Sequence, residues 1–333
     1  MSNPALSKIA TRREILRAGG LLIGGGLIAG RALSAFAAPQ QATAPQTNGF
    51  NLGGGQLAKL RAQMAATPLQ TQQLGENIHM LFGPGGNMVV LDGADGKVLV
   101  DASLMEVAPK VKAILDGMGG LPLKLLINTH WHWDHTDGNA AMHGYGATIL
   151  AHENTRKRLS TPQEAFGAHF DPSPAAAWPQ QTFADSSRLY VNGEDIEMRH
   201  FLPAHTDSDI YVYYHHANVF HAGDTFFNGF YPVIDASTGG NIDGMIGAAS
   251  HILGTVDSRT KIVPGHGPLG DRASLEKYFD MLVTVRDRLK ALKTSGKTVA
   301  EAVMAKPTAD LDETWAKGLL TPDVFVSMVY PTI

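Results

Sequence analysis

The sequence predicts an α/β fold, an αββα sandwich in which two mixed β-sheets pack face to face and helices cover the outside. Two observations lead to this prediction. Short β-rich runs come in two groups along the 333 residues, and each group is closed by segments with the apolar spacing of a helix. Turns that contain glycine separate the runs, as they do where short strands follow one another closely.

The first group of strands lies in the N-terminal half of the chain. Runs at 78–82, 87–91 and 98–100 alternate with turns and predict an antiparallel meander. Residues 107–118 then have helical spacing. The continuous apolar run 123–127 leads straight into a polar segment, as a buried strand that ends at a functional loop would.

A strand at 148–151 and a proline-rich stretch separate the two groups. Residues 160–185 contain four prolines and are expected to form a long loop or irregular insertion. Such an insertion is either a lid over the functional site or a tolerated surface loop, and the sequence leaves both open.

The second group begins with the strongest hairpin signal in the chain, at 188–201. Asn192-Gly193 supplies the positive φ angles that a two-residue turn requires. The other elements expected are a strand pair at 209–214 and 219–221, a helix at 243–254, a short strand at 261–263, and a helix with one apolar face from Leu275 to Leu292.

The N-terminus is typical of an exported protein. Arg12-Arg13 precedes an apolar run at 18–29, which predicts a twin-arginine signal peptide over residues 1–37. The run is broken by glycines and is shorter than the ~20 residues of a spanning helix. We therefore expect cleavage rather than a stable membrane anchor, the twin-arginine translocase as a partner during export, and a periplasmic location.

Behind the signal peptide, the composition predicts three further parts. Residues 38–55 are rich in Pro, Gln, Thr, Asn and Gly and are expected to form a flexible linker. Residues 56–333 are expected to form one domain, which ends in helices over 273–333.

Charge and cysteine content exclude several classes of function. Removal of residues 1–37 takes five basic residues and one acidic residue from the 27 and 31 of the whole chain, which leaves a formal charge of −8. A chain this acidic has no bulk attraction for nucleic acid, so we expect a small-molecule substrate. Cysteine is absent, which excludes disulfides, thiolate ligands and thiol nucleophiles.

The sharpest signal is the segment Thr129-His130-Trp131-His132-Trp133-Asp134-His135. It places three imidazoles and one carboxylate directly after the strand at 123–127. Zinc-like divalent ions take imidazole nitrogen and carboxylate oxygen as ligands. Alternation puts His130 and His132 on one side of an extended segment, while Asp134 and His135 turn towards a neighbouring position, so two adjacent metal ions are plausible.

With three later motifs, this segment resembles the metallo-β-lactamase superfamily. The motifs are Pro203-Ala204-His205-Thr206, His221-Ala222-Gly223-Asp224-Thr225 and Pro264-Gly265-His266-Gly267. Each follows an expected strand, and their order and approximate spacing over residues 75–270 agree with the family.

The resemblance implies a dinuclear site with seven ligands. It assigns His130, His132 and His205 to the first metal ion. It assigns Asp134, His135 and His266 to the second. Asp224 would bridge the two, and two Zn²⁺ ions per chain are expected. Each of the nine other histidines is expected to lie outside the metal site.

Hydrolysis of an acyl bond is the activity that the resemblance implies, with Asp134 as the catalytic residue. Two cations would lower the pKa of a shared water and polarise a carbonyl, and Asp134 would orient the nucleophile or pass on its proton. A β-lactam, lactone, thioester or ester is compatible with this chemistry. Two alternatives stay open: a mono-iron oxidoreductase of the persulfide-dioxygenase type, and a periplasmic metal-binding protein without turnover.

Three positions depart from particular relatives. Asp224 excludes the enzymes that have Cys at the second metal. Phe227 stands where similar homoserine-lactone lactonases have Tyr, which puts that activity in doubt, although Tyr231 is nearby. Trp133 replaces the usual Ala of β-lactamases with an all-His first site, so antibiotic hydrolysis stays open.

Overall fold

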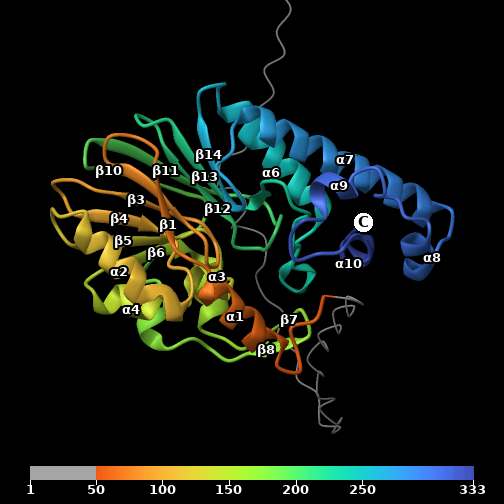
Figure 1. Cartoon of the computed structure of the whole chain (residues 1–333), viewed down its shortest axis with the longest axis horizontal. Helices are drawn as coiled ribbons and strands as arrows, with labels where there is room; N and C mark the ends of the chain where they lie inside the picture. The colour runs from red at the N-terminus through yellow and green to blue at the C-terminus, as the bar shows by residue number, and fades with distance from the viewer. Residues whose placement is uncertain (1–49) are drawn as a thin grey trace, which may run out of the picture. The chain divides into compact units, whose positions relative to one another are not determined.

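Two β-sheets lie at the centre of the protein, with helices packed around them (Figure 1). The structure is a computed structural model, and it describes residues 50–333. The predicted signal peptide 1–37 and most of the predicted linker 38–55 lie outside the described residues.

The first sheet has seven strands in the order β1-β2-β3-β4-β5-β6-β9. Strands β1 to β4 pair antiparallel, which includes the predicted meander, whereas β4, β5, β6 and β9 run parallel. The bounds are β1 Gln70–Gln73, β2 Ile78–Phe82, β3 Met88–Leu91, β4 Lys97–Val100, β5 Leu123–Asn128, β6 Thr148–His152 and β9 Gln181–Phe183.

The second sheet has five strands in the order β10-β11-β12-β13-β14. Its pairs are antiparallel except β13 with β14, so this sheet is mixed too. The bounds are β10 Ser186–Val191, β11 Glu194–His200, β12 Ile210–Tyr214, β13 Val219–Phe227 and β14 Lys261–His266.

Ten α-helices accompany the sheets in residues 50–333. Their bounds are α1 Gln56–Ala66, α2 Ala108–Gly117, α3 Trp133–Thr136, α4 Asn139–Gly144, α5 Glu153–Leu159, α6 Ile242–Thr255, α7 Arg272–Thr294, α8 Val299–Met304, α9 Asp312–Trp315 and α10 Pro322–Val329. The long helix α7 begins at a capping box of Asp271 and Ser274, and its predicted apolar face is buried at Leu275, Leu282 and Leu289.

The hydrophobic core has three layers, as the sandwich requires. Between the sheets, side chains such as Val89 of β3 and Val212 of β12 share one buried cluster. A second cluster joins the first sheet to α2 and α4, and a third joins the second sheet to α6, α7 and α10. The predicted αββα sandwich is therefore confirmed.

Two segments differ from what the sequence predicts. The insertion 160–185 is not a plain loop, because it contains the hairpin β7 Gln163–Ala165 and β8 Ala168–Phe170, and β9 extends the first sheet. Residues 50–55 are not a loose linker: Leu52 is buried, and its amide donates to the carbonyl of Phe166 at 2.7 Å. Contacts with Phe166, in the turn of the β7–β8 hairpin, hold this N-terminal arm (residues 50–66) in place. The local composition of the arm gives no sign of them.

Strands β13 and β14 also run longer than the sequence predicts. Both continue past the apolar runs to Phe227 and His266, through the glycines at 223 and 265. Among residues 50–333, none of the helices combines the length and apolar character that crossing a membrane requires.

Candidate metal centre

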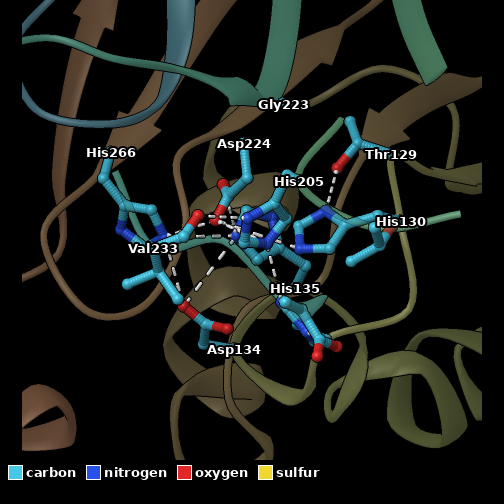
Figure 2. Close-up of polar contacts among 12 residues, drawn as sticks. Thr129, His130, Asp134, His135, His205, Gly223, Asp224, Val233 and His266 are labelled. Atoms are coloured by element: carbon cyan, nitrogen blue, oxygen red, sulfur yellow. Dashed lines mark hydrogen bonds and ion pairs between the residues drawn. The ribbon is translucent and has the colours of Figure 1, made fainter. Parts of the chain in front are cut away.

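The seven predicted ligands lie together in the fold. Figure 2 labels all of them except His132. The loop after β5 carries His130 and His132, and the short helix α3 carries Asp134 and His135. From the second sheet come His205 in the loop after β11, Asp224 within β13 and His266 at the end of β14. The fold thus joins ligands that are up to 136 positions apart in the sequence.

The first ligand group consists of His130, His132 and His205. One nitrogen of each ring lies within 4.8 Å of the others, and Nδ1 of His132 is 2.8 Å from Nε2 of His205. The other nitrogen of each ring has an outer contact. Nδ1 of His130 lies 3.1 Å from Thr129 Oγ1, and Nε2 of His132 lies 3.1 Å from Asp235 Oδ2. Nδ1 of His205 lies 2.7 Å from the carbonyl oxygen of Val233. These outer contacts direct Nε2 of His130, Nδ1 of His132 and Nε2 of His205 towards one point.

The second ligand group consists of Asp134, His135 and His266. Nε2 of His266 lies 3.3 Å from Asp134 Oδ2 and 3.4 Å from Nε2 of His135. Nδ1 of His135 donates to Asp101 Oδ2 at 2.8 Å, which leaves Nε2 to face the other two ligands.

Asp224 lies between the two groups and is 5% exposed. Its Oδ1 is 3.1 Å from Nε2 of His135, and its Oδ2 is 3.3 Å from Nε2 of His266 and 3.4 Å from Nε2 of His205. One carboxylate therefore contacts a histidine of the first group and two of the second, which is the position that a bridging ligand needs.

The donor set fits divalent metal ions. Nε2 of His130 and Oδ1 of Asp224 are fully buried and have no hydrogen bond with any described residue. A buried polar atom without a hydrogen bond is costly, and although Oδ1 of Asp224 faces Nε2 of His135 as an ion pair, coordination to a cation would satisfy both atoms. Five imidazoles and two carboxylates, with no sulfur, are ligands typical of zinc and related ions. That these residues bind metal stays a prediction.

The pKa values of four of the ligand histidines are shifted, in opposite directions for the two groups. Burial lowers the pKa of His130 well below its usual range and that of His205 to about 4, so both rings are neutral at pH 7. Burial alone would also lower the pKa of His266, but Asp224 and Asp134 outweigh it and raise the pKa to about 9. The pKa of His135 is raised for the same reason by Asp224 and Asp101. A metal ion at the second group must displace these protons.

Two functional residues escaped the sequence analysis: Asp101 and Asp235. Asp101 follows β4 directly, is fully buried, and adopts a φ of 61°. Its carboxylate accepts from the amide of Thr129 at 2.8 Å as well as from His135. The signal available was its position, one residue after a predicted buried strand. Asp235 lies in an irregular segment, where no pattern distinguishes it.

A cavity of about 280 Å³ opens above the ligands. Asp134, Asp224 and three of the histidines contribute to its wall. Trp133 lines it, whereas Trp131 lines a neighbouring depression and packs against Phe170. Most of the remaining wall is apolar, and Lys317 and Gly318 complete it. The apolar part is supplied by Phe50, Leu52, Leu60, Met64, Phe166, Phe227, Phe230, Tyr231, Val233 and Leu319.

The other histidines stay outside the centre. Within residues 50–333, none of the nine joins a group that could hold a metal ion. His152 and His200 stack on each other at 3.8 Å, and each donates to or accepts from backbone groups instead. Tyr231, although it lines the cavity, uses its hydroxyl to donate to Asp312 at 2.8 Å.

Comparisons with known proteins agree with this geometry. A family model described as the metallo-beta-lactamase superfamily matches residues 82–288, and no curated protein matches the chain. A metallo-beta-lactamase from Pontibacter korlensis superposes with a TM-score of 0.56 at 17% identity, over 65% of this chain and 99% of that one. The DIM-1 metallo-beta-lactamase gives 0.53 at 20% identity, over 66% and 99%.

A stereoselective inverting sec-alkylsulfatase from Pseudomonas sp. gives a TM-score of 0.60 at 17% identity. It covers 79% of this chain and 50% of its own, so the present chain spans about half of that enzyme. At these identities the superpositions establish the fold. Because the family model covers more than half of the sequence, the chain belongs to the metallo-β-lactamase superfamily.

Proposed function

We propose that this chain is an exported hydrolase that holds two metal ions and cleaves an acyl bond in a small substrate. The observation that carries the proposal is the convergence of seven ligand side chains, with Asp224 between two groups, at the wall of an apolar cavity. Cavities of this kind, with a few convergent polar groups, are the usual place of catalysis in enzymes.

The bound ions would supply an acidified water and a polarised carbonyl oxygen. Overall, water adds to the acyl carbon, the bond to the leaving atom breaks, and the leaving atom takes a proton. Asp134 is the residue proposed to move that proton. Burial would raise its pKa, but His135 and the hydrogen bond with His266 lower the pKa to about 2, so the carboxylate is ionised at neutral pH.

Zinc is the proposed metal, with two ions per chain. The neutral rings of His130 and His205 are ready to coordinate, and nitrogen and oxygen donors suit zinc. Metal analysis of the purified mature protein tests this directly. Two zinc ions per chain support the proposal, whereas a single iron ion supports the persulfide-dioxygenase type of oxidoreductase instead.

A substrate panel tests the reaction. It should contain a β-lactam, a lactone, a thioester and a simple ester, together with a secondary alkyl sulfate because an alkylsulfatase shares the fold over 79% of this chain. Metal-dependent cleavage of an acyl substrate, abolished in His132→Ala, is the expected result. Cleavage of the sulfate alone would move the function to sulfate esters. No turnover with two metals bound would favour a metal-binding protein.

Export to the periplasm through the twin-arginine route is the second part of the proposal, and the pair Arg12-Arg13 supports it. The double variant Arg12→Lys with Arg13→Lys should leave the precursor in the cytoplasm. Lys293→Arg, far from the signal, serves as a control for expression. Unchanged export of the double variant would point to another translocase.

A further inference from the structure

One charged side chain in the cavity wall has no part in the metal centre. Lys317 lines the cavity with Gly318 and Leu319, in the loop between α9 and α10. Among the lining residues within the described chain, it is the one charged residue that is not a predicted metal ligand. This loop lies beyond residues 82–288, so the family match says nothing about it.

The backbone on both sides of Lys317 is held in place. The amide of Tyr231 donates to the carbonyl of Trp315 at 2.8 Å, and Phe230 pairs with Ala316 in an antiparallel bridge. A Cβ atom on Gly318 would lie 3.1 Å from the ring of Phe230, so the loop packs closely there. The backbone at Lys317 is therefore held beside the cavity before any ligand binds, while the lysine side chain is exposed at its edge.

The ammonium group itself is not engaged. Neither a hydrogen bond nor an ion pair joins Lys317 to another residue of the described range 50–333. Apart from the predicted metal ligands, the surrounding cavity wall is largely apolar, and residues 38–333 together carry the formal charge of −8 given above. An isolated cation at the edge of an apolar cavity in an acidic protein attracts an anionic group, and nearby apolar surface strengthens that attraction.

We propose that the substrate has an apolar body, which fills the cavity, and a carboxylate separate from the cleaved bond, which pairs with Lys317. Lys317 is then a specificity-determining residue. This inference rests on the proposed acyl hydrolysis. The apolar body would contact side chains from three segments, represented by Leu60 of the N-terminal arm, Phe166 of the β7–β8 turn and Phe230 after β13.

A matched pair of esters tests the proposal. The 4-nitrophenyl ester of octanoic acid is neutral, and the mono-4-nitrophenyl ester of octanedioic acid has the same chain length with a terminal carboxylate. For Lys317→Met, we expect KM for the charged ester to rise about 5- to 10-fold with kcat little changed, and the neutral ester to be unaffected. Lys317→Arg should restore most of the preference. Lys290→Met, an exposed lysine of α7, is the matched control.

Binding without turnover separates this inference from the proposed function. The monoamide of octanedioic acid, and neutral octanamide for comparison, are titrated calorimetrically into wild-type and Lys317→Met protein, both as purified with their metal content unchanged. Weaker binding to the variant supports the role of Lys317 even if no acyl substrate is cleaved. Equal binding by both proteins, or an equal rise in KM for both esters, overturns it. If no acyl substrate of the panel is cleaved in a metal-dependent way, the proposed hydrolysis is wrong, but the binding result for Lys317 still stands.

Discussion

The carboxylate of Asp101 fixes the ring of His135, whose Nδ1 lies 2.8 Å from Asp101 Oδ2. Both side chains are fully buried. The same carboxylate accepts from the amide and the hydroxyl of Thr129, at 2.8 and 2.7 Å, and so ties the start of the ligand loop to the end of β4. Outer contacts of this kind orient a metal-binding imidazole and raise its basicity.

Replacement of Asp101 by Asn should weaken metal binding without unfolding the protein. The amide keeps the shape of the carboxylate but removes the charge that faces His135, so affinity for the second ion should fall about 10- to 100-fold. Competition with a chromophoric chelator measures this. Asp116→Asn, an exposed residue of α2 that pairs with Lys112, is the control and should bind as the wild type does. Wild-type affinity in Asp101→Asn would remove Asp101 from this role.

The sequence predicts the ligands that lie close together along the chain, such as His130, but it does not predict Asp101, which lies far from them in the sequence. Four ligands fall within residues 130–135, and their density alone indicates a metal site. Asp101 is 34 positions away from His135, and the two meet only because β4 and β5 lie side by side in the first sheet. The parallel pairing of β4 with β5 is part of the tertiary structure, so a local sequence pattern cannot predict it.

The cavity wall was harder still to predict. The N-terminal arm has the composition of a linker, but Phe50 packs on Phe166 with ring centroids 5.2 Å apart. The sequence predicts strands at 219–221 and 261–263, but β13 and β14 continue through glycines, a residue unusual within a strand. The structure gives the reason for one of these glycines: a side chain at Gly265 would occupy the position of Asp224 Oδ1.

Gly265→Ala should therefore disturb the centre through Asp224. The added methyl group collides with the carboxylate, which must turn away from His135 and His266. We expect loss of metal at the second group and a fall in kcat, while the far-ultraviolet circular dichroism stays that of the wild type. Gly254→Ala in α6 has open space around the new methyl group and serves as the control. Full metal content in Gly265→Ala would contradict the close approach.

Stability of the metal-free protein should fall as the pH rises from 6.5 to 9. The pKa of His266 is about 9 in the folded chain and 6.5 when unfolded, because Asp224 and Asp134 outweigh the effect of burial. Its contribution is fully present below pH 6.5 and is lost as the pH rises through 9, a change of the order of 3 kcal/mol. Urea unfolding at both pH values measures it.

The His266→Gln variant isolates that contribution, since other groups titrate in the same range. Its metal-free stability should change less between pH 6.5 and 9 than that of the wild type. Identical pH profiles for the two proteins would mean that His266 is not protonated in the folded state. Zinc binding at pH 7.5 should release protons, because the metal displaces them from His266 and His135.

The last prediction concerns Asp224, the carboxylate shared by both ligand groups. Its two oxygens lie 3.1 to 3.4 Å from nitrogens of His135, His266 and His205. Two cations held this close repel each other, and one shared anion offsets much of that repulsion. Asp224→Ala should therefore lose the second ion before the first, because the first keeps three imidazoles as a complete ligand set.

Equilibrium dialysis at a series of zinc concentrations distinguishes the two ions in Asp224→Ala. We expect about one zinc ion per chain at concentrations that give two in the wild type, with a fall in kcat of at least about 100-fold. Asp280→Ala, an exposed residue of α7, should keep both ions. If Asp224→Ala retains two ions at wild-type affinity, the bridging assignment is wrong. The central position of this carboxylate would then reflect its contacts with protonated histidines, which the pKa values of His135 and His266 favour in the metal-free chain.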